Sequence, residues 1–293
     1  KLKEQNLSIY NFFKEDDRIK LYAGYNYEFK EIFNGYIAKI KPSEITELYC
    51  ENESYIAKRT LVNDATYKDI SLETLLTNIG VKDFEIRNYR ASKIAQNLGT
   101  FEILNSPNLI DVFEKLKSDF GFTFFYEREK LIVEPIAYIN DHIITCEELY
   151  NIVSSNSLQF ENETSYKVVS GVESKQKDKT ILKAFSYYLP NGSIKTVGEV
   201  PKGYAISWMR TPNKSQLQCE QISASRLKNI TYRGMKGGLT LKFEPFAKRS
   251  DVCNYINPLM PRMNGQYLIS EVHYAYSRNN GLSQDLTLAN KIK

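Results

Sequence analysis

The sequence is poor in the residue types that most often carry catalysis. Only two histidines, four cysteines and one tryptophan occur among its 293 residues. A catalytic triad needs a nucleophile and an orienting acid that converge on one imidazole. His273 lies within a predicted strand and His142 within a predicted turn, and neither belongs to a His-Glu-x-x-His pair. We therefore interpret both histidines as structural.

The four cysteines lie too far apart in the sequence to form a local metal or redox motif. They are Cys50, Cys146, Cys219 and Cys253. Zinc sites and redox-active pairs usually place cysteines about two to four residues apart. We expect free, half-buried thiols in a reducing compartment, and we predict no metal site and no cofactor.

Long apolar stretches and a surplus of one charge are also missing. Apolar runs such as 121–126 are far shorter than the roughly 20 residues that cross a bilayer, so we expect no stable membrane insertion. No signal peptide is visible, and because the chain starts with Lys1 rather than Met we expect residues to be missing upstream. The net charge of +4 arises from 39 basic and 35 acidic residues, which does not favour a nucleic-acid-binding protein.

Two further patterns could carry chemistry but have simpler interpretations. The glycines at 234, 237 and 238 precede a strand-like segment, whereas a phosphate-binding loop should precede a helix. We predict a turn between strands there. The acidic pairs at 16–17 and 147–148 could serve a glycosidase, but adjacent carboxylates point in different directions, so we interpret them as surface and turn residues. We predict no catalytic residue and a protein that is not an enzyme.

What the chain does contain is typical of β-sheet. It has 21 tyrosines and 15 phenylalanines, which favour pleated and half-buried surfaces. Residues 18–58 alternate polar and apolar side chains, as in Ile19, Leu21 and Ala23. This period of two predicts an antiparallel sheet with one wet face.

The middle of the chain predicts a small α+β domain. Ser106 is a candidate N-cap, Pro107 fits the first helical position, and Gly121 follows the end of the helix. One face of this helix carries Leu109, Val112, Phe113, Leu116 and Phe120. A second, shorter helix over 72–79 should be capped by Ser71 and closed by Gly80. Residues 122–133 predict a hairpin that turns at 127–129.

Strand patterns return after this domain. Residues 166–172 and 180–188 predict strands, and Asn191-Gly192 predicts a hairpin turn. A helix over 215–227 should bury Leu217, Ile222 and Leu227, and the end of the chain, 268–288, is again strand-like. The fold class is therefore mainly β with an α+β insert: a first β domain at 1–58, the insert at 59–138, and a second β domain at 139–293 with its helix near 215–227.

Four segments resemble the phage late control protein D family, which includes the baseplate hubs of contractile tails. Residues 16–37 contain an acidic turn, a strand ending in Gly-Tyr and a strand with Phe-Asn-Gly-Tyr-Ile. Residues 45–76 continue with a strand, acidic residues and a short helix. Residues 105–133 resemble the insert of the family, and 265–292 resemble its terminal strands. The order and spacing of the segments carry the resemblance, although 257–264 look like an insertion and the first strands of the family are absent.

The resemblance implies a structural role in a tail. Family hubs are homotrimers in which each chain contributes two tube-like antiparallel β-barrels that flank the insert. Three chains thereby adapt a sixfold tail tube to a threefold spike around an axial channel. The implied partners are the tail tube protein, the central spike protein and other baseplate proteins, with DNA only as passing cargo. The implied location is the baseplate of a virion tail that assembles in the bacterial cytoplasm.

Three alternatives remain open at this point. The chain could be the hub portion of a type VI secretion or extracellular injection spike, which shares the fold of the family. It could be a tail-associated peptidoglycan hydrolase or a protease, although no matching motif is present. It could also be a carbohydrate-binding β-sandwich, but the helix at 108–120 has no natural place in that fold.

Overall fold

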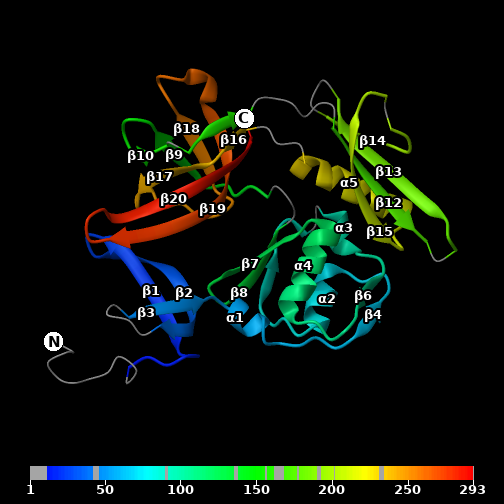
Figure 1. The fold of residues 1–293 in the computed structure, drawn as a ribbon, viewed down its shortest axis with the longest axis horizontal. Helices are drawn as coiled ribbons and strands as arrows, with labels where there is room; N and C mark the ends of the chain where they lie inside the picture. The colour runs from blue at the N-terminus through cyan, green and yellow to red at the C-terminus, as the bar shows by residue number, and fades with distance from the viewer. Residues whose placement is uncertain are drawn as a thin grey trace.

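The computed structural model is mainly β and consists of several sheets (Figure 1). It describes residues 12–41, 46–89, 92–134, 138–155, 157–161, 168–176, 178–189, 193–200, 202–230 and 234–292. The turn predicted at Asn191-Gly192 lies outside these residues.

The N-terminal part forms a three-stranded antiparallel sheet that has almost no core of its own. Its strands, in spatial order, are β1 (Arg18–Tyr25), β2 (Glu28–Lys41) and β3 (Glu47–Glu51). Ile37 is its one fully buried large hydrophobic residue among those described, whereas Leu21, Tyr22 and Phe29 are more than half exposed. The predicted strands are present, but both faces of the sheet are exposed to solvent in the isolated chain.

The predicted α+β region forms a compact unit beside this sheet (Figure 1). Its helices are α1 (Ser54–Ala57), α2 (Leu72–Asn78), α3 (Lys93–Gln96) and α4 (Leu109–Phe120). Strands β4 (Ala65–Tyr67) and β6 (Phe101–Ile103) pair with each other, and β5 (Phe84–Ile86), β8 (Lys130–Glu134) and β7 (Thr123–Glu127) form a second small sheet. The predicted hairpin is confirmed as β7 and β8.

Helix α4 has the predicted buried face but starts at a different cap. All five residues predicted on its apolar face are buried. The N-cap is Asn108, not Ser106: Asn108 Oδ1 accepts a hydrogen bond from Asp111 N at 3.0 Å, and Asp111 Oδ2 accepts one from Asn108 N at 3.2 Å. This capping box satisfies two backbone donors at once, which a serine at 106 cannot do from two residues upstream. Gly121 ends the helix in the left-handed region, at φ 76°.

The stretch 139–293, which we expected to form a single barrel domain, contains two separate sheets. The first is four-stranded, in the spatial order β14 (Ile194–Val197), β13 (Ile181–Tyr188), β12 (Val168–Lys175) and β15 (Ala205–Pro212). Helix α5 (Gln216–Ile230) covers one of its faces. Val172, Ala184, Cys219 and Ile222 from this unit join the hydrophobic core of the α+β insert. Leu217 is 58% exposed, so that part of the helix prediction is wrong, whereas Ile222 and Leu227 are buried as predicted.

The second sheet has eight strands and its own core. Its main path is β10 (Ile152–Ser154), β17 (Gly238–Lys242), β20 (Gly281–Lys291), β19 (Gly265–Ser277), β18 (Val252–Ile256) and β9 (Ile143–Glu147). Strands β11 (Gln159–Glu161) and β16 (Gly234–Lys236) complete it, and a 3-10 turn, Pro261–Met263, follows β18. No ladder closes this sheet within the described residues. The expected barrels and the exact domain boundaries therefore stay predictions.

Candidate functional site: a charged groove where three parts of the chain meet

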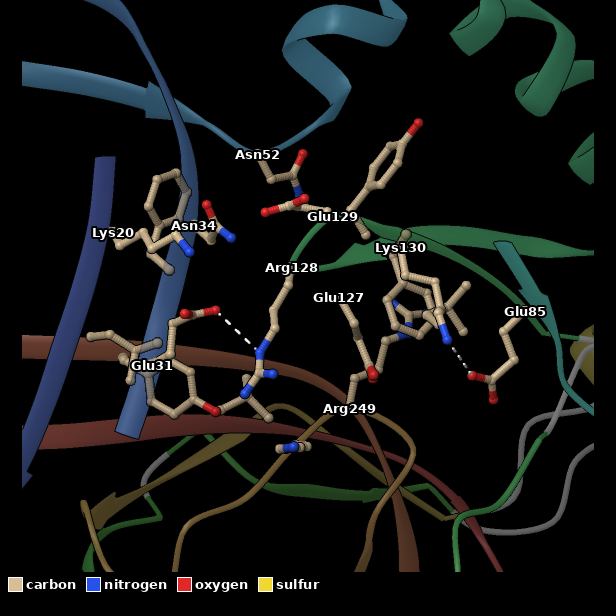
Figure 2. Close-up of a pocket in the computed structure, with 18 of the residues that line it drawn as sticks. Lys20, Glu31, Asn34, Asn52, Glu85, Glu127, Arg128, Glu129, Lys130 and Arg249 are labelled. Atoms are coloured by element: carbon tan, nitrogen blue, oxygen red, sulfur yellow. Dashed lines mark ion pairs between the residues drawn. The ribbon is translucent and has the colours of Figure 1, made fainter. Parts of the chain in front are cut away.

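A groove lies where the N-terminal sheet, the β7–β8 hairpin and the eight-stranded sheet meet (Figure 2). It has a volume of about 880 Å³. We call it the junction groove. Its lining includes Glu31 from β2, Arg128 at the tip of the β7–β8 hairpin, and Arg249 from the loop before β18.

The charges of the junction groove balance one another. Its basic residues are Lys20, Arg128, Lys130, Lys248 and Arg249, and its acidic residues are Glu31, Asp83, Glu85, Glu127 and Glu129. Arg128 points across the groove to Glu31, with 3.2 Å between Nε and Oε1 (Figure 2). Lys130 pairs with Glu85 at 3.7 Å, and Glu129 pairs with Arg18 of β1 at 2.8 Å. These ion pairs join neighbouring parts of the chain and leave no concentration of one charge for a small ionic ligand.

A buried carboxylate of the insert is hydrogen-bonded to the loop that leads into β18 of the eight-stranded sheet. Glu134, at the end of β8, is 3% exposed, and its Oε1 accepts a hydrogen bond from Arg87 Nη1 at 2.5 Å. Ser250, just before β18, donates its hydroxyl to Oε2 of the same carboxylate at 2.8 Å. Burial raises the pKa of Glu134, against the lowering effect of these two partners. The carboxylate acts as a structural link between two units of the fold.

The two histidines do not form a catalytic centre with the residues described. A ring nitrogen of His142, Nδ1, lies 2.7 Å from Oδ2 of the buried Asp251. This pair has the geometry of a base and its orienting acid, but the nearby Ser250 hydroxyl donates to Glu134 instead. His273 lies on β19 with its side chain 71% exposed. Asp251, which the sequence analysis missed, also accepts the backbone N–H of Lys248 at 2.9 Å.

The glycines and acidic pairs that the sequence analysis considered lie in turns, strands and structural hydrogen bonds. The glycines at 234, 237 and 238 belong to β16, to the turn with φ 97° at Gly237, and to β17, so the predicted turn between strands is confirmed. Asp16 accepts a hydrogen bond from the Tyr55 hydroxyl, and Glu148 accepts one from the Tyr255 hydroxyl at 2.9 Å. No group of three or more metal-ligating side chains occurs in the described part of the chain.

The four cysteines are free thiols in the structure. Cys146, Cys219 and Cys253 are buried, and Cys50 is half-buried. Cys253 lies beside Cys146, and contact with that thiol together with burial raises its pKa well above the usual value. Burial raises the pKa of Cys219 and of Cys50 as well. Thiols with raised pKa values are poor nucleophiles.

The N-terminal sheet and the eight-stranded sheet meet at the tips of two hairpins. The Tyr25 hydroxyl, at the β1–β2 turn, donates to the carbonyl of Leu282 at 3.0 Å and accepts from its N–H at 3.2 Å. Lys30 of β2 pairs with Glu244 at 2.7 Å. Figure 1 shows β1 directly below the turn between β19 and β20. The N-terminal sheet thus contacts the eight-stranded sheet, although the two partners lie 257 positions apart in the sequence.

Comparison with solved structures identifies this arrangement. A tail protein from Neisseria meningitidis MC58 superposes with a TM-score of 0.64 at 10% identity, over 89% of this chain and 81% of that one. The 43 kDa tail protein of prophage MuSo2 from Shewanella oneidensis gives 0.59 at 9% identity, over 95% and 85% of the two chains. The chain has the fold of phage tail proteins. The resemblance stated from the sequence is thereby confirmed at the level of the fold.

The same tail-protein fold occurs in a secretion system. A component of the E. coli type VI secretion system, described as structurally similar to two tail proteins of bacteriophage T4, gives a TM-score of 0.52 at 12% identity, over 94% of this chain and 64% of that one. No family model and no curated protein match the sequence. None of the described helices is long and apolar enough to span a membrane.

Proposed function

We propose that the protein is the baseplate hub of a phage tail or of a related contractile injection machine. In this role it forms a homotrimer that adapts a sixfold tail tube to a threefold spike around an axial channel. Its partners are the tail tube protein, the central spike protein and other baseplate proteins, and DNA passes through the channel only as cargo. The protein assembles in the bacterial cytoplasm, resides in the tail baseplate and has no enzymatic activity.

The observation that carries this proposal is the extent of the fold similarity. The match to the MuSo2 tail protein covers 95% of the chain, which is too much to leave out the N-terminal sheet, the insert or the eight-stranded sheet. A similarity confined to one sheet would support only a shared building block. Similarity across separate β regions and an insert supports a shared role in an assembly.

The exposed apolar surface of the N-terminal sheet supports assembly into an oligomer. Leu21 is 52% exposed, Phe29 is 62% exposed and Tyr27 is 94% exposed. A sheet of three strands needs a covered apolar face to be stable, and Ile37 alone is fully buried among its described large hydrophobic residues. Large apolar side chains that are exposed on a sheet with so little core of its own support an interaction surface. In the proposed trimer, neighbouring subunits cover it.

The free strand edges support the same conclusion. Among the described residues, β1 and β3 each pair with β2 alone, and β9 and β10 end the main path of the eight-stranded sheet. Unpaired edges invite pairing with other chains, and a closed ring satisfies them without open-ended aggregation. We propose that the N-terminal sheet and the eight-stranded sheet form the two tube-like barrels when three chains assemble.

The experiment is to measure the mass of the purified full chain by light scattering at micromolar concentration. The proposal predicts three copies per particle for the wild type. Leu21→Glu combined with Phe29→Glu should give monomers in which hydrogen exchange shows the insert and the eight-stranded sheet still protected. Leu217→Glu, a matched control at an exposed leucine on α5, should remain trimeric. A monomeric wild type contradicts the proposal, and a zymogram that shows peptidoglycan cleavage contradicts its non-enzymatic part.

A second candidate is the hub portion of a type VI secretion spike. The similarity to the E. coli secretion component favours it, because that match covers 94% of this chain. The same match covers only 64% of the secretion component, so that protein contains further sequence. A spike domain encoded directly after this segment in the full gene supports the secretion assignment. A separate spike gene next to tube and tape-measure genes supports the phage assignment.

A further inference from the structure

The four-stranded sheet β14–β13–β12–β15 has two chemically different faces. Side chains alternate between the faces along each strand, and residues opposite one another in the register share a face. Val172 and Ala184 face α5, since they pack with Cys219 and Ile222 in one buried cluster. Their neighbours Gly171 and Phe185 therefore lie on the other face, which we call the open face.

All charged residues of the four strands lie on the open face. The strand register places four basic residues there, Lys175, Lys183, Lys195 and Arg210, and a single acidic residue, Glu173. The whole chain has 39 basic and 35 acidic residues. The open face therefore has an excess of positive charge that the nearly even charge balance of the whole chain does not reveal. The Arg210 side chain is 85% exposed and that of Lys183 is 46% exposed, whereas that of Glu173 is 23% exposed.

Aromatic rings lie among these basic side chains. Trp208 is 44% exposed, and its indole packs edge-on against Phe185, with ring centroids 5.3 Å apart. Both rings lie over Gly171: a Cβ there would be 3.1 Å from Trp208 Cε3 and 3.3 Å from Phe185 Cε1. The missing side chain of Gly171 thus makes room for the indole on the strand. Phe185 is itself only 4% exposed and supports the indole, while the half-buried Tyr187 and Tyr204, 5.3 Å apart, are further rings on this face.

The charged groups are close enough to the rings to contact the same ligand. Lys183 Nζ lies 5.8 Å from the centroid of the Trp208 ring. Glu173 is 3.6 Å from both Lys183 and Arg210, so one carboxylate faces two cations and leaves one positive charge uncompensated. Lys175 and Lys195, at opposite corners of the face, add further positive charge.

We propose that the open face binds single-stranded nucleic acid. Unpaired bases stack on exposed aromatic rings whatever their sequence, and phosphates bind the surrounding lysines and arginines. A carbohydrate would stack on Trp208 but would gain nothing from the four basic side chains. An acidic polypeptide would bind the lysines and arginines, but it has no flat bases that could stack on the aromatic rings of this face. Double-stranded DNA hides its base faces, so the rings favour single strands. This binding goes beyond the proposed hub role and does not depend on it.

The lone tryptophan makes this proposal directly measurable, because the intrinsic indole fluorescence of the full chain comes from Trp208 alone. Titration with an oligothymidylate of about twelve nucleotides should quench this fluorescence to saturation. The affinity should fall with salt, with a log–log slope of about −2 to −3 for three or four phosphate contacts. A duplex of the same length should bind about tenfold more weakly or worse.

Variants assign the binding to the open face. Lys183→Glu with Arg210→Glu should weaken binding of a labelled oligothymidylate about tenfold or more, and Trp208→Ala should weaken it by about a similar factor. The matched control, Lys68→Glu with Lys82→Glu, reverses two exposed charges on the insert and should change binding by less than about twofold. Circular dichroism of each variant should match the wild type. Trp208→Phe, which keeps a ring, should retain most of the binding.

Three outcomes overturn the proposal. The first is no quenching at an oligonucleotide concentration of about 100 μM in low salt. The second is equal weakening by the control pair and by the open-face pair, which would show non-specific attraction. The third is quenching by an oligoglutamate peptide but not by the oligonucleotide, which would assign the face to an acidic protein partner.

Discussion

The Lys214 ammonium lies 4.1 Å from the centroid of the Phe120 ring, in a contact that joins two units of the fold. Lys214 precedes α5 and is 3% exposed, while Phe120 ends α4. The ammonium approaches the carbonyls of Leu98 and Thr100 only at 3.4 Å each. Burial lowers the pKa of Lys214 to about 8, against the opposing effect of the Asp119 carboxylate.

This burial predicts a specific pH dependence of stability. The unfolded chain holds the Lys214 proton up to pH 10.5, whereas the folded chain releases it near pH 8. The folded state therefore binds fewer protons between these values, so the Lys214 contribution to stability rises as the pH increases through this window. Below pH 8 the buried charge costs on the order of 3 kcal/mol.

We expect Lys214→Met to stabilise the protein at pH 7 and to lose this advantage as the pH approaches 10. The readout is the difference in urea-unfolding free energy between variant and wild type at several pH values, which cancels the titration of the cysteines and tyrosines. Lys82→Met, at an exposed lysine, is the control and should show a difference independent of pH. A constant difference for Lys214→Met would mean that this lysine is not buried as described.

The apolar face of α4 predicts a severe effect of a buried charge. Phe113 is 3% exposed and stacks on Phe124 at 5.0 Å between centroids, and Leu116 is fully buried. Phe113→Asp or Leu116→Asp should unfold the insert, with a loss of more than about 3 kcal/mol, because an unpaired carboxylate enters its core. Ser118→Asp places the same residue on the exposed face and should cost less than about 1 kcal/mol. Equal melting temperatures for all three variants would refute this helix face.

The two arginine–glutamate pairs, Arg87–Glu134 and Arg128–Glu31, should contribute differently to the free energy of unfolding. Arg87→Met leaves the Glu134 carboxylate buried without its main partner and should cost about 3 kcal/mol at neutral pH. Because burial raises the pKa of Glu134 in the folded state, part of this loss should return as the pH falls and the carboxyl group protonates. Arg128→Met breaks a pair whose arginine is 76% exposed and should cost less than about 1 kcal/mol. Similar losses in both variants would contradict the assignment of Glu134 as a buried carboxylate that depends on Arg87.

The contact between the hairpin tips should contribute to the docking of the N-terminal sheet. Tyr25→Phe removes both hydrogen bonds to Leu282 and should destabilise the chain by about 1–2 kcal/mol. Hydrogen exchange should also speed up in β1 and β2 while the insert remains protected. Tyr27→Phe, at a residue that is 94% exposed, provides the control and should change neither quantity.

Local features of the fold could be predicted from the sequence because their causes are local. The buried face of α4, the Gly121 terminator and the β7–β8 hairpin each depend on residues within one turn or one hairpin. The cap was misplaced by two positions because Ser106 and Asn108 both fit an N-cap pattern. Asp64, which accepts the backbone N–H of Ser106, comes from a distant part of the chain.

The division of 139–293 into two sheets could not be predicted in the same way. Strand β15 pairs with β12 in parallel, and β20 pairs with β17 and β19 in the other sheet. The period of two in a strand reveals that it is a strand but not which partner it takes. The junction groove is equally non-local, since Glu31 and Arg128 meet across 97 positions of sequence.

The measurement that tests the hub assignment most directly is electron microscopy of the purified full chain. The proposal predicts ring-shaped particles with threefold symmetry, a central passage and six similar β-barrels around it, two from each chain. Single subunits at micromolar concentration, or rings of another symmetry without paired barrels, would contradict it.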